Sequence, residues 1–420
     1  MNQPEILLLE LLRQAITDSC LSLSEIPDRQ TWQKMIQLAK IHDVVPLVIR
    51  AIWKLDQIHN IGSSYVTQAQ NKIIVQAGKT ADFLLLYEYL SDRGLHPVVI
   101  KGIILRDIYP QPELRISTDE DILINPADFP RYHEAFLQYG LTPVNASSDY
   151  SAADEVSYEN KEMHLYIEVH KSLFLTNTEA FGDFNSCFRD AMDQSIAKKI
   201  YDTEIRTLTY TDHLLYLILH ALKHFLYSGF GIRQICDIIL FSDYYRQEID
   251  WAFVSLELQR IQALEFTRAV YKIGLTYLLP ENHLQTIWDS WNCMQIDEKP
   301  LLHDIMEGGI YGASSVARLH SSNLTLQAAK QRGKKGFNKL FIPVSSVLHT
   351  VFLPIDKMSG RFPYLKKDPI LLPIAWLQRI FGYLMEQTLT KHSKKKLNTA
   401  EPIRIGRSRV GLLKQYGIIK

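Results

Sequence analysis

Residues 98–125 read VVIKGIILRDIYPQPELRISTDEDILIN, and this stretch decides the fold. It predicts an apolar strand, a Lys-Gly turn, a short helical run closed by Tyr-Pro, and a second strand that carries Asp119 and Asp121. Because side chains alternate between the two faces of a strand, both carboxylates point the same way and Glu120 points the other way. Two like charges side by side repel each other, so the pair needs a cation or a shifted pKa. We interpret the pair as a site for divalent metal.

A second acidic strand is predicted farther along the chain. In residues 163–174, MHLYIEVHKSLF, apolar side chains alternate with polar ones that include Glu168 and His170, which is typical of a strand with one buried face. Carboxylates suit Mg²⁺ or Mn²⁺, and two such ions about 3.5–4 Å apart suit phosphoryl or nucleotidyl transfer. We therefore expect Asp119, Asp121 and Glu168 to bind metal and act in catalysis, with His170 lining the cleft. An isolated Asp-x-Asp pair at a strand end is often surface decoration, but the flanking turn and the second acidic strand favour the metal site.

The Lys101-Gly102 turn is a candidate anion-binding turn. A glycine there lets the backbone approach an anion, the following helix offers N–H groups, and Lys101 adds a positive charge. The signal is weak alone, because a strand-Gly-helix turn is often only a turn. The sequence contains neither a P-loop nor a G-x-G-x-x-G motif, so these two nucleotide-binding folds are not indicated.

Three histidines share one face of a helix predicted at residues 211–227. His213, His220 and His224 are separated by seven and four residues, and Lys223 lies close to the same face. Zinc binding through His220 and His224 fits the i, i+4 spacing, but the glutamate of an H-E-x-x-H site is missing. We expect Lys223 to bind phosphate near the carboxylates, and His220 and His224 to line the cleft.

Further charged residues allow two interpretations each. Arg115 either neutralises a substrate phosphate or pairs with Asp119 or Glu120, and we favour the substrate. Arg233 and Asp237, four residues apart on the next predicted helix, either pair with each other or take part in catalysis.

The composition is that of an ordinary globular protein. The chain of 420 residues is 46% hydrophobic and 22% charged, long enough for two or three cores, and no apolar run reaches the roughly 18 residues of a membrane-spanning helix. Acidic residues interrupt the apolar N-terminal run, which indicates an amphipathic helix rather than a signal peptide. Four widely spaced cysteines, Cys20, Cys187, Cys236 and Cys293, fit buried thiols better than a disulfide framework or a zinc site. We expect a cytoplasmic protein.

Charge is unevenly distributed along the chain. The net charge is zero, but residues 330–420 hold 19 Lys and Arg residues against 4 Asp and Glu residues. Such a basic tail indicates an acidic partner, such as nucleic acid, anionic lipid or polyphosphate, or else a solvated extension. Within it, the apolar residues 369–387 predict either an interfacial helix or a helix packed on the main body.

Taken together, the motifs resemble a known family. The chain is similar to the uncharacterised nucleotidyltransferase family of the polymerase-β-type superfamily, and the similarity is densest over residues 97–240. It is carried by the series IKG, YP, R, TDEDILI, IEVH, H, LKH and IRQICDI. The stretch PYLKKDPILLPIAWLQR resembles the C-terminal part of its longer bacterial members. The resemblance implies metal-dependent transfer of a nucleoside monophosphate from a nucleoside triphosphate (NTP) to an acceptor hydroxyl. It places Asp119, Asp121 and Glu168 at the metal, Lys101 and Gly102 in the nucleotide turn, and Lys223 at the triphosphate.

The resemblance and the helical periodicity together predict four regions. These are an N-terminal helical region (1–94), a nucleotidyltransferase α/β core (95–210), a helical domain that completes the cleft (211–329) and a basic C-terminal extension (330–420). The expected fold class is α+β, with a small mixed sheet and flanking helices embedded in a largely helical chain. Residues 145–161 are expected to form a polar loop.

Two residues depart from the usual pattern of the superfamily. Ile103 stands where a serine usually follows the glycine, which removes a hydroxyl contact to phosphate. Glu120 stands where an apolar residue usually separates the two acids, and a charge there must be paired or lie at a sheet edge. Two alternatives to an active enzyme follow: a catalytically degenerate nucleotide-binding protein, and an adaptor that binds anionic lipid or nucleic acid through its basic tail. The acceptor of the enzyme could be a small molecule, a protein or RNA.

Overall fold

The computed structural model describes most of the chain before residue 310 and the C-terminal helix. The described residues are 1–19, 26–144, 150, 153–176, 184–227, 229–280, 284–309, 318, 321, 325–326, 328, 371–376, 378 and 400–419. Their buried apolar side chains form one contiguous core that extends from the N-terminal helices to the C-terminal helix.

A mixed sheet of seven strands forms the α/β part of the described chain, in the order β3-β4-β5-β2-β1-β7-β6. The β2–β5 and β1–β7 pairs are parallel, whereas the other neighbours are antiparallel. The strands are β1 (Val98–Ile100), β2 (Glu120–Leu123), β3 (Thr142–Pro143), β4 (Glu155–Asn160), β5 (Leu165–His170), β6 (Ile196–Ile200) and β7 (Thr203–Thr207). The mixed sheet with flanking helices confirms the expected α+β class.

The structure corrects one expectation about this sheet. Residues 155–160 form strand β4, which pairs along its whole length with β5, so the loop expected at 145–161 is wrong in its second half. The alternation of apolar and polar residues expected in 163–174 is confirmed, because Leu165, Ile167 and Val169 are buried in β5.

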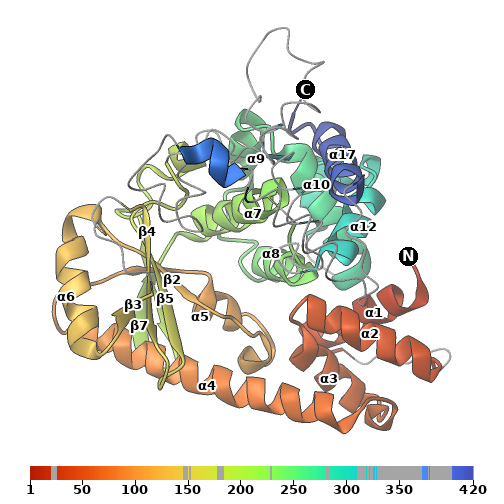
Figure 1. Ribbon diagram of the computed structural model, residues 1–420, viewed down its shortest axis with the longest axis horizontal. Coiled ribbons are helices and arrows are strands. Elements are labelled where there is room, and N and C mark those ends of the chain that lie inside the picture. Colours follow the sequence, from red (N-terminus) through yellow and green to blue (C-terminus); the bar gives the residue numbers. More distant parts are fainter. Residues whose placement is uncertain are drawn as a thin grey trace, which may run out of the picture.

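In the described residues before the sheet, the chain forms four α-helices, as the helical pattern of residues 1–94 predicts. They are α1 (Gln3–Thr17), α2 (Arg29–Ile41), α3 (Val45–Lys54) and the long α4 (Ser63–Ser91). Helix α4 runs along the sheet and packs against β5, β7 and helix α6 (Phe129–Tyr139) through Phe83, Leu86, Tyr87 and Leu90 (Figure 1). Helix α6 ends at Gly140, whose φ of 93° is the left-handed conformation that glycine adopts at helix ends.

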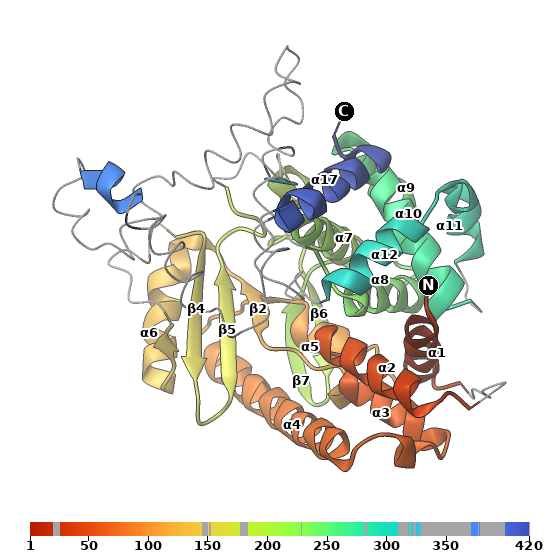
Figure 2. The same ribbon diagram turned by 45° about the vertical axis from the view of Figure 1, so that its right-hand side comes forward.

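A second set of helices lies on the other side of the sheet from α6 (Figure 1). It comprises α7 (Tyr210–Tyr227), α8 (Ile232–Tyr244), α9 (Trp251–Arg260), α10 (Leu264–Ile273), α11 (Gln285–Ser290) and α12 (Lys299–Gly308). Helices α7 and α8 pack against each other, and Figure 2 shows both beside the short α5 (Gly102–Arg106), which follows β1. The division of the chain into four domains stays a prediction.

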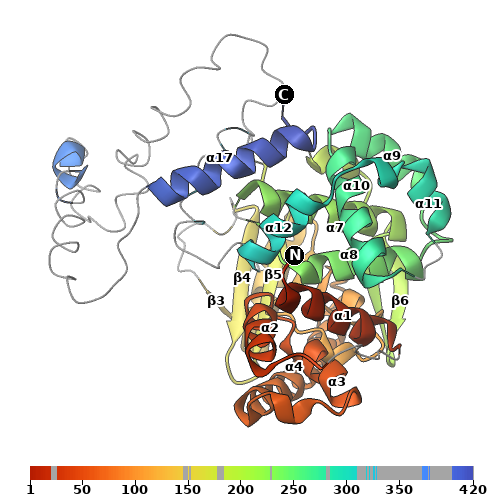
Figure 3. The ribbon, with the colours of Figure 1, turned by 90° about the vertical axis from the view of Figure 1, so that its right-hand side faces the viewer.

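The C-terminal helix α17 (Ala400–Gln415) lies across this helical part, next to α12 (Figure 3). Its Arg409 is 1% exposed and donates hydrogen bonds to the carbonyl oxygens of Phe225 and Tyr227 at the end of α7. Arg409 Nε also lies 3.5 Å from Asp304 of α12. Most of the basic tail, including more than half of the apolar segment 369–387, lies outside the described residues, so the interpretations of its partner stay predictions.

Cysteine and membrane expectations can be compared with the described part of the chain. Cys187, Cys236 and Cys293 are buried free thiols, as expected, and Cys20 lies outside the described residues. Among the helices described, none is long and apolar enough to cross a membrane.

Candidate active site

The turn between β1 and α5 has a backbone conformation that tertiary contacts must hold. Lys101 has φ 59° and ψ −132°, a conformation that is costly for a residue with a Cβ. Its N–H donates to Nε2 of His213 at 3.2 Å, and His213 Nδ1 lies 3.3 Å from the Thr207 hydroxyl, which itself donates to the Val99 carbonyl. Nδ1 therefore carries the proton, and burial together with Lys101 lowers the pKa of His213 to about 3. A neutral histidine thus anchors the turn.

The carboxylate of Glu120 lies beside this turn, where the sequence analysis expected a bound anion. It is fully buried in the central strand β2, and its carboxylate accepts the Ile103 N–H at 2.9 Å and pairs with Arg106 at 2.6 Å. A Cβ on Gly102, whose φ is 40°, would overlap that carboxylate. Glu120 is therefore a paired structural residue away from any sheet edge, and the Ile103 N–H expected to bind phosphate already has an acceptor.

Asp121 stands at the centre of a cluster of charged groups. Its Oδ1 lies 2.9 Å from Lys101 Nζ and 3.1 Å from His170 Nε2, and the residue is 1% exposed. Burial alone would raise the pKa of Asp121, but Lys101 and His170 lower it to about 2. Asp121 is therefore an anion at neutral pH, as a metal ligand must be.

Glu168 lies beside Asp121 because the two residues are partners on the parallel strands β2 and β5. Ligand atoms of Asp121, Glu168 and His170 all lie within 4.8 Å of one another. Asp121 Oδ2 is buried and has no hydrogen-bond partner among the described residues. Two carboxylates, an imidazole and an unpartnered buried oxygen are a suitable donor set for a divalent ion. Asp119, which the sequence analysis paired with Asp121 as a metal ligand, lies outside this set, although it lines the same pocket.

The environment of Glu168 favours its protonated form. Burial and the neighbouring carboxylates of Asp121 and Asp119 together raise the pKa of Glu168 to about 8, although the positive charge of Lys101 opposes this rise. Three carboxylates around one position are typical of a site that gains stability from an added cation.

Metal affinity is expected to rise with pH up to about 8, because a divalent ion must displace the proton of Glu168. Below that pH, the apparent affinity should increase by up to about tenfold per pH unit, and binding near neutral pH should release about one proton. Calorimetric titration of Mg²⁺ or Mn²⁺ in two buffers with different ionisation enthalpies measures this release. Glu168→Gln is the control, since its amide has no proton to lose. Binding to the wild type without proton release near neutral pH would contradict the prediction.

The histidines of α7 gather around the same lysine. His220 Nε2 lies 3.3 Å from Lys101 Nζ and 3.2 Å from His224 Nε2. Burial and the nearby lysines lower the pKa of His220 well below its usual value and that of His224 to about 3. Both rings are therefore neutral at physiological pH. Lys223 is partly buried nearby, and burial followed by the charge of Lys101 lowers its pKa.

Arg115 and Arg233 have partners that the sequence did not predict. Arg115 makes two hydrogen bonds to Asp237, from Nε at 2.7 Å and from Nη2 at 2.8 Å. Arg233 Nη1 donates to the Ile116 carbonyl at 2.5 Å and lies 3.2 Å from Asp43. The predicted Arg233–Asp237 pair is therefore wrong, and Arg115 pairs with neither Asp119 nor Glu120. The role of Arg115 toward a substrate stays a prediction.

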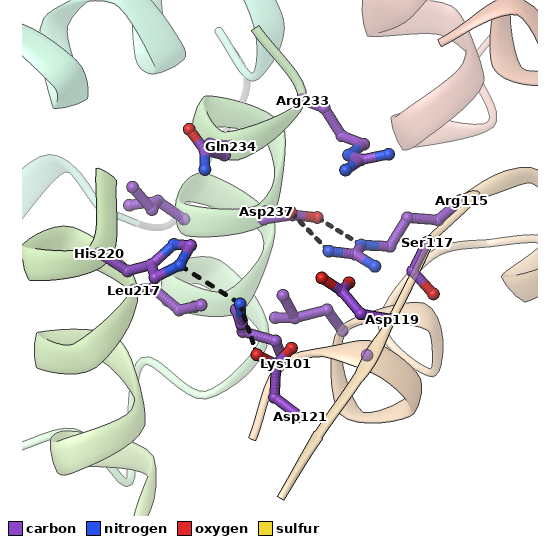
Figure 4. Close-up of a pocket in the computed structure, with 13 residues that line it drawn as sticks. Lys101, Arg115, Ser117, Asp119, Asp121, Leu217, His220, Arg233, Gln234 and Asp237 are labelled. Carbon is purple, nitrogen blue, oxygen red and sulfur yellow. Dashed lines mark hydrogen bonds and ion pairs between the residues drawn. The ribbon is translucent and has the colours of Figure 1, made fainter. Parts of the chain in front are cut away.

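Several of these groups line one pocket between the sheet and helices α7 and α8 (Figure 4), but Glu168, His170, Lys223 and His224 are not among its lining residues. The sheet side contributes residues of the turn and of the acidic strand, and the helices contribute polar and apolar residues opposite them. The lining residues are Lys101, Gly102, Leu105, Arg115, Ser117, Asp119, Asp121, Leu217, His220, Arg233, Gln234, Asp237 and Ile238. Aspartate side chains from both the sheet side and helix α8 thus lie among lysine, arginine and histidine side chains around the pocket.

Three residues near the site had no signal in the sequence. Glu155 of β4 lies 3.6 Å from His170 Nδ1, but β4 itself was not predicted. Arg106 is the only charged residue of an otherwise apolar helical segment, so the sequence contained no indication of its ionic partner. Lys79 of α4 donates to the carbonyls of residues 117 and 118, at 2.9 and 2.7 Å, and so holds the segment before Asp119.

Comparison with known proteins adds one finding. The model of a family described as an uncharacterised nucleotidyltransferase matches residues 28–277, more than half of the chain. No curated protein and no solved structure matches the chain significantly. The matched region includes every residue that lines the pocket.

Proposed function

The chain belongs to the uncharacterised nucleotidyltransferase family, and from this premise we propose that it transfers a nucleoside monophosphate from an NTP to an acceptor hydroxyl with the help of a divalent metal. A cytoplasmic location is part of the same proposal. The observation that carries it is the pairing of Asp121 with Glu168 on adjacent parallel strands, next to His170 and Lys101.

Asp121, Glu168 and His170 would hold the ion, with Asp119 close by in the same pocket. When bound, Mg²⁺ or Mn²⁺ supplies Lewis-acid stabilisation of negative charge on phosphate oxygens. The imidazole nitrogen of His170 suits Mn²⁺ in addition to Mg²⁺, because nitrogen donors favour transition metals.

The cations around the pocket would bind and orient the triphosphate. Lys101 and Lys223 supply ammonium groups near the carboxylates, and Arg115 supplies the guanidinium edge that Asp237 does not use. His220 lines the pocket, and the neutral rings of His220 and His224 add no positive charge to that of Lys101 and Lys223.

In the transfer itself, the acceptor oxygen bonds to the α-phosphorus as the bond to the bridging oxygen breaks, and pyrophosphate leaves. We assign Asp119 to accept the hydroxyl proton of the acceptor. It lines the pocket but lies outside the cluster of ligand atoms, so its carboxylate is available near the reacting groups.

Nucleotide binding and label transfer test the proposal together. NTP is titrated with Mg²⁺ into the wild type and into an Asp119→Asn, Asp121→Asn double variant, and label from an α-labelled NTP is followed in a cell lysate. We expect metal-dependent nucleotide affinity and label transfer in the wild type and a loss of both in the double variant, because two of the proposed acidic groups are neutralised. Equal affinity in the two proteins would refute the metal site.

A degenerate nucleotide-binding protein is the second candidate. The observation that favours it is that the Ile103 N–H already donates a hydrogen bond to Glu120, so this N–H is not available to bind a phosphate. Metal-dependent nucleotide binding without any transferred label supports this candidate, whereas label transfer that requires Asp121 excludes it.

A further inference from the structure

Two buried arginines on one side of the pocket have incomplete hydrogen bonding. Arg115 is 4% exposed and Arg233 is 7% exposed, and both line the pocket. Arg115 Nη1 and Arg233 Nε have no hydrogen-bond partner among the described residues. Figure 4 shows the two guanidinium groups on one side of the pocket and Lys101 on the other. Buried donors are nearly always satisfied in folded proteins, so this pair calls for an acceptor.

Both guanidinium groups are held in place by other contacts. Asp237 binds Nε and Nη2 of Arg115 and leaves its third nitrogen unused. The Ile116 carbonyl and Asp43 bind Nη1 of Arg233 and leave Nε unused. Donors fixed in this way lose little conformational entropy when a ligand binds.

Asp43 is not available to neutralise Arg233 alone. Asp43 is shared between Arg233 and Lys72, whose ammonium lies 2.6 Å from the same carboxyl group. One carboxylate therefore faces two cations. Three cations, Lys101, Arg115 and Arg233, and three aspartates, Asp119, Asp121 and Asp237, line the pocket. An anion bound there would therefore draw its countercharge from Lys101 and the two arginines.

We propose that Arg233 and the unused edge of Arg115 form a subsite for a phosphate-type anion, which rests on and deepens the proposed function. Guanidinium groups match the oxygen spacing of phosphate and stay charged at every physiological pH. The subsite also supplies donors that the turn does not, since Glu120 accepts the Ile103 N–H. Its ligand is either the terminal phosphates of the NTP or a phosphate group of the acceptor.

A purely structural role for Arg233 makes a different prediction from the anion subsite. If Arg233 only connects α8 to the N-terminal helices, removing its partner Asp43 should have the same effect as removing Arg233 itself. If Arg233 binds an anion, removing Asp43 leaves the guanidinium in the pocket. Asp43→Asn is therefore the matched control, and asparagine tolerates the positive φ of 53° at that position.

The experiment titrates tripolyphosphate into the metal-free wild type, Arg233→Gln and Asp43→Asn, and inorganic phosphate into the same proteins with nucleotide bound. We expect Arg233→Gln to weaken at least one of the two anions about tenfold or more and Asp43→Asn to change neither by more than about twofold. A loss for tripolyphosphate assigns the subsite to the NTP, and a loss confined to inorganic phosphate assigns it to the acceptor. Unchanged affinities, or equal losses in both variants, overturn the proposal.

Two further measurements keep the result interpretable. Denaturant midpoints of all variants report folding, and Arg233→Lys replaces Arg233→Gln if the latter does not fold, because it keeps the charge but loses the planar fork and should still weaken binding. The proposed function and the subsite can fail separately. If the wild type transfers no label but Arg233 substitution weakens anion binding, the subsite stands and the proposed function fails. If the wild type transfers label but Arg233 substitution leaves anion binding unchanged, only the subsite is refuted.

Discussion

Asp121→Asn is expected to lower the rate of nucleotidyl transfer by on the order of a thousandfold or more, the largest effect of any single substitution in the pocket. Asp121 is the ionised member of the proposed ligand set and contacts both Lys101 and His170. An amide oxygen is a poorer ligand for a hard cation, and it removes the charge that holds the ammonium of Lys101 in place. Steady-state transfer rates at saturating Mg²⁺ and NTP measure the effect.

Two companion variants make this prediction specific. Asp119→Asn should also slow transfer but should leave the affinity of the Asp121, Glu168 and His170 cluster for a first metal ion nearly unchanged. Asp202→Asn is the control for an exposed aspartate, since Asp202 lies fully exposed at the turn between β6 and β7. Transfer by Asp121→Asn within about tenfold of the wild type would contradict a metal-binding role for this residue.

Glu120→Ala is expected to destabilise the fold by roughly 3–5 kcal/mol, because it leaves Arg106 buried without its ionic partner. The two side chains are 1% exposed or less, and the substitution also leaves the Ile103 N–H without its acceptor. The free energy of unfolding from urea or guanidinium titration measures the loss.

The double variant Glu120→Leu, Arg106→Met is the control for this second prediction. Replacing both charges with apolar groups of similar size should cost much less than the single change, since buried ion pairs contribute little net stability relative to apolar packing. A Glu120→Ala protein as stable as the wild type would show that the pair does not hold the turn. Glu120 would then be only a departure from the family pattern.

Local patterns in the sequence predicted the elements that carry the site. Strand β5 and helix α7 have an apolar periodicity that assigns their residues to faces before any tertiary information, whereas every residue of the short strands β1 and β2 is buried. The sequence analysis expected Glu168 near Asp121 because both are acidic residues on predicted strands. The pairing of β2 with β5, which makes the two residues neighbours, is a tertiary feature that the sequence patterns did not give.

Partners far apart in the sequence could not be predicted in this way. Arg115 and Asp237 are 122 residues apart, and Arg233 and Asp43 are 190 residues apart. The four-residue spacing of Arg233 and Asp237 suggested a helical pair, but each side chain makes a stronger contact with a group from another element. The four-residue spacing rule describes side-chain pairs on isolated helices. In a folded core, the partner of a buried charge depends also on the cost of removing both groups from water.

The strands that the sequence analysis missed have weak local signals. Strands β4, β6 and β7 each contain two charged residues, such as Lys198 in β6 and Glu204 and Arg206 in β7, and β6 lies at an edge of the sheet. Their stability comes from pairing with a neighbour rather than from their own apolar content. Glu155, which faces His170, was missed for the same reason.

The hydrogen bonds of Arg409 show that the folded structure extends beyond the region matched by the family model, which is residues 28–277. A guanidinium at the C-terminal end of a helix satisfies carbonyls that the helix leaves open and opposes its negative dipole. Here that helix is α7, the element that presents His220 and Lys223 to the pocket, and the donor comes from about 180 residues later in the chain. The matched region stops at residue 277. A fragment that ends at residue 277 would therefore keep every residue that lines the pocket but lose Arg409, which donates hydrogen bonds to the last carbonyls of α7.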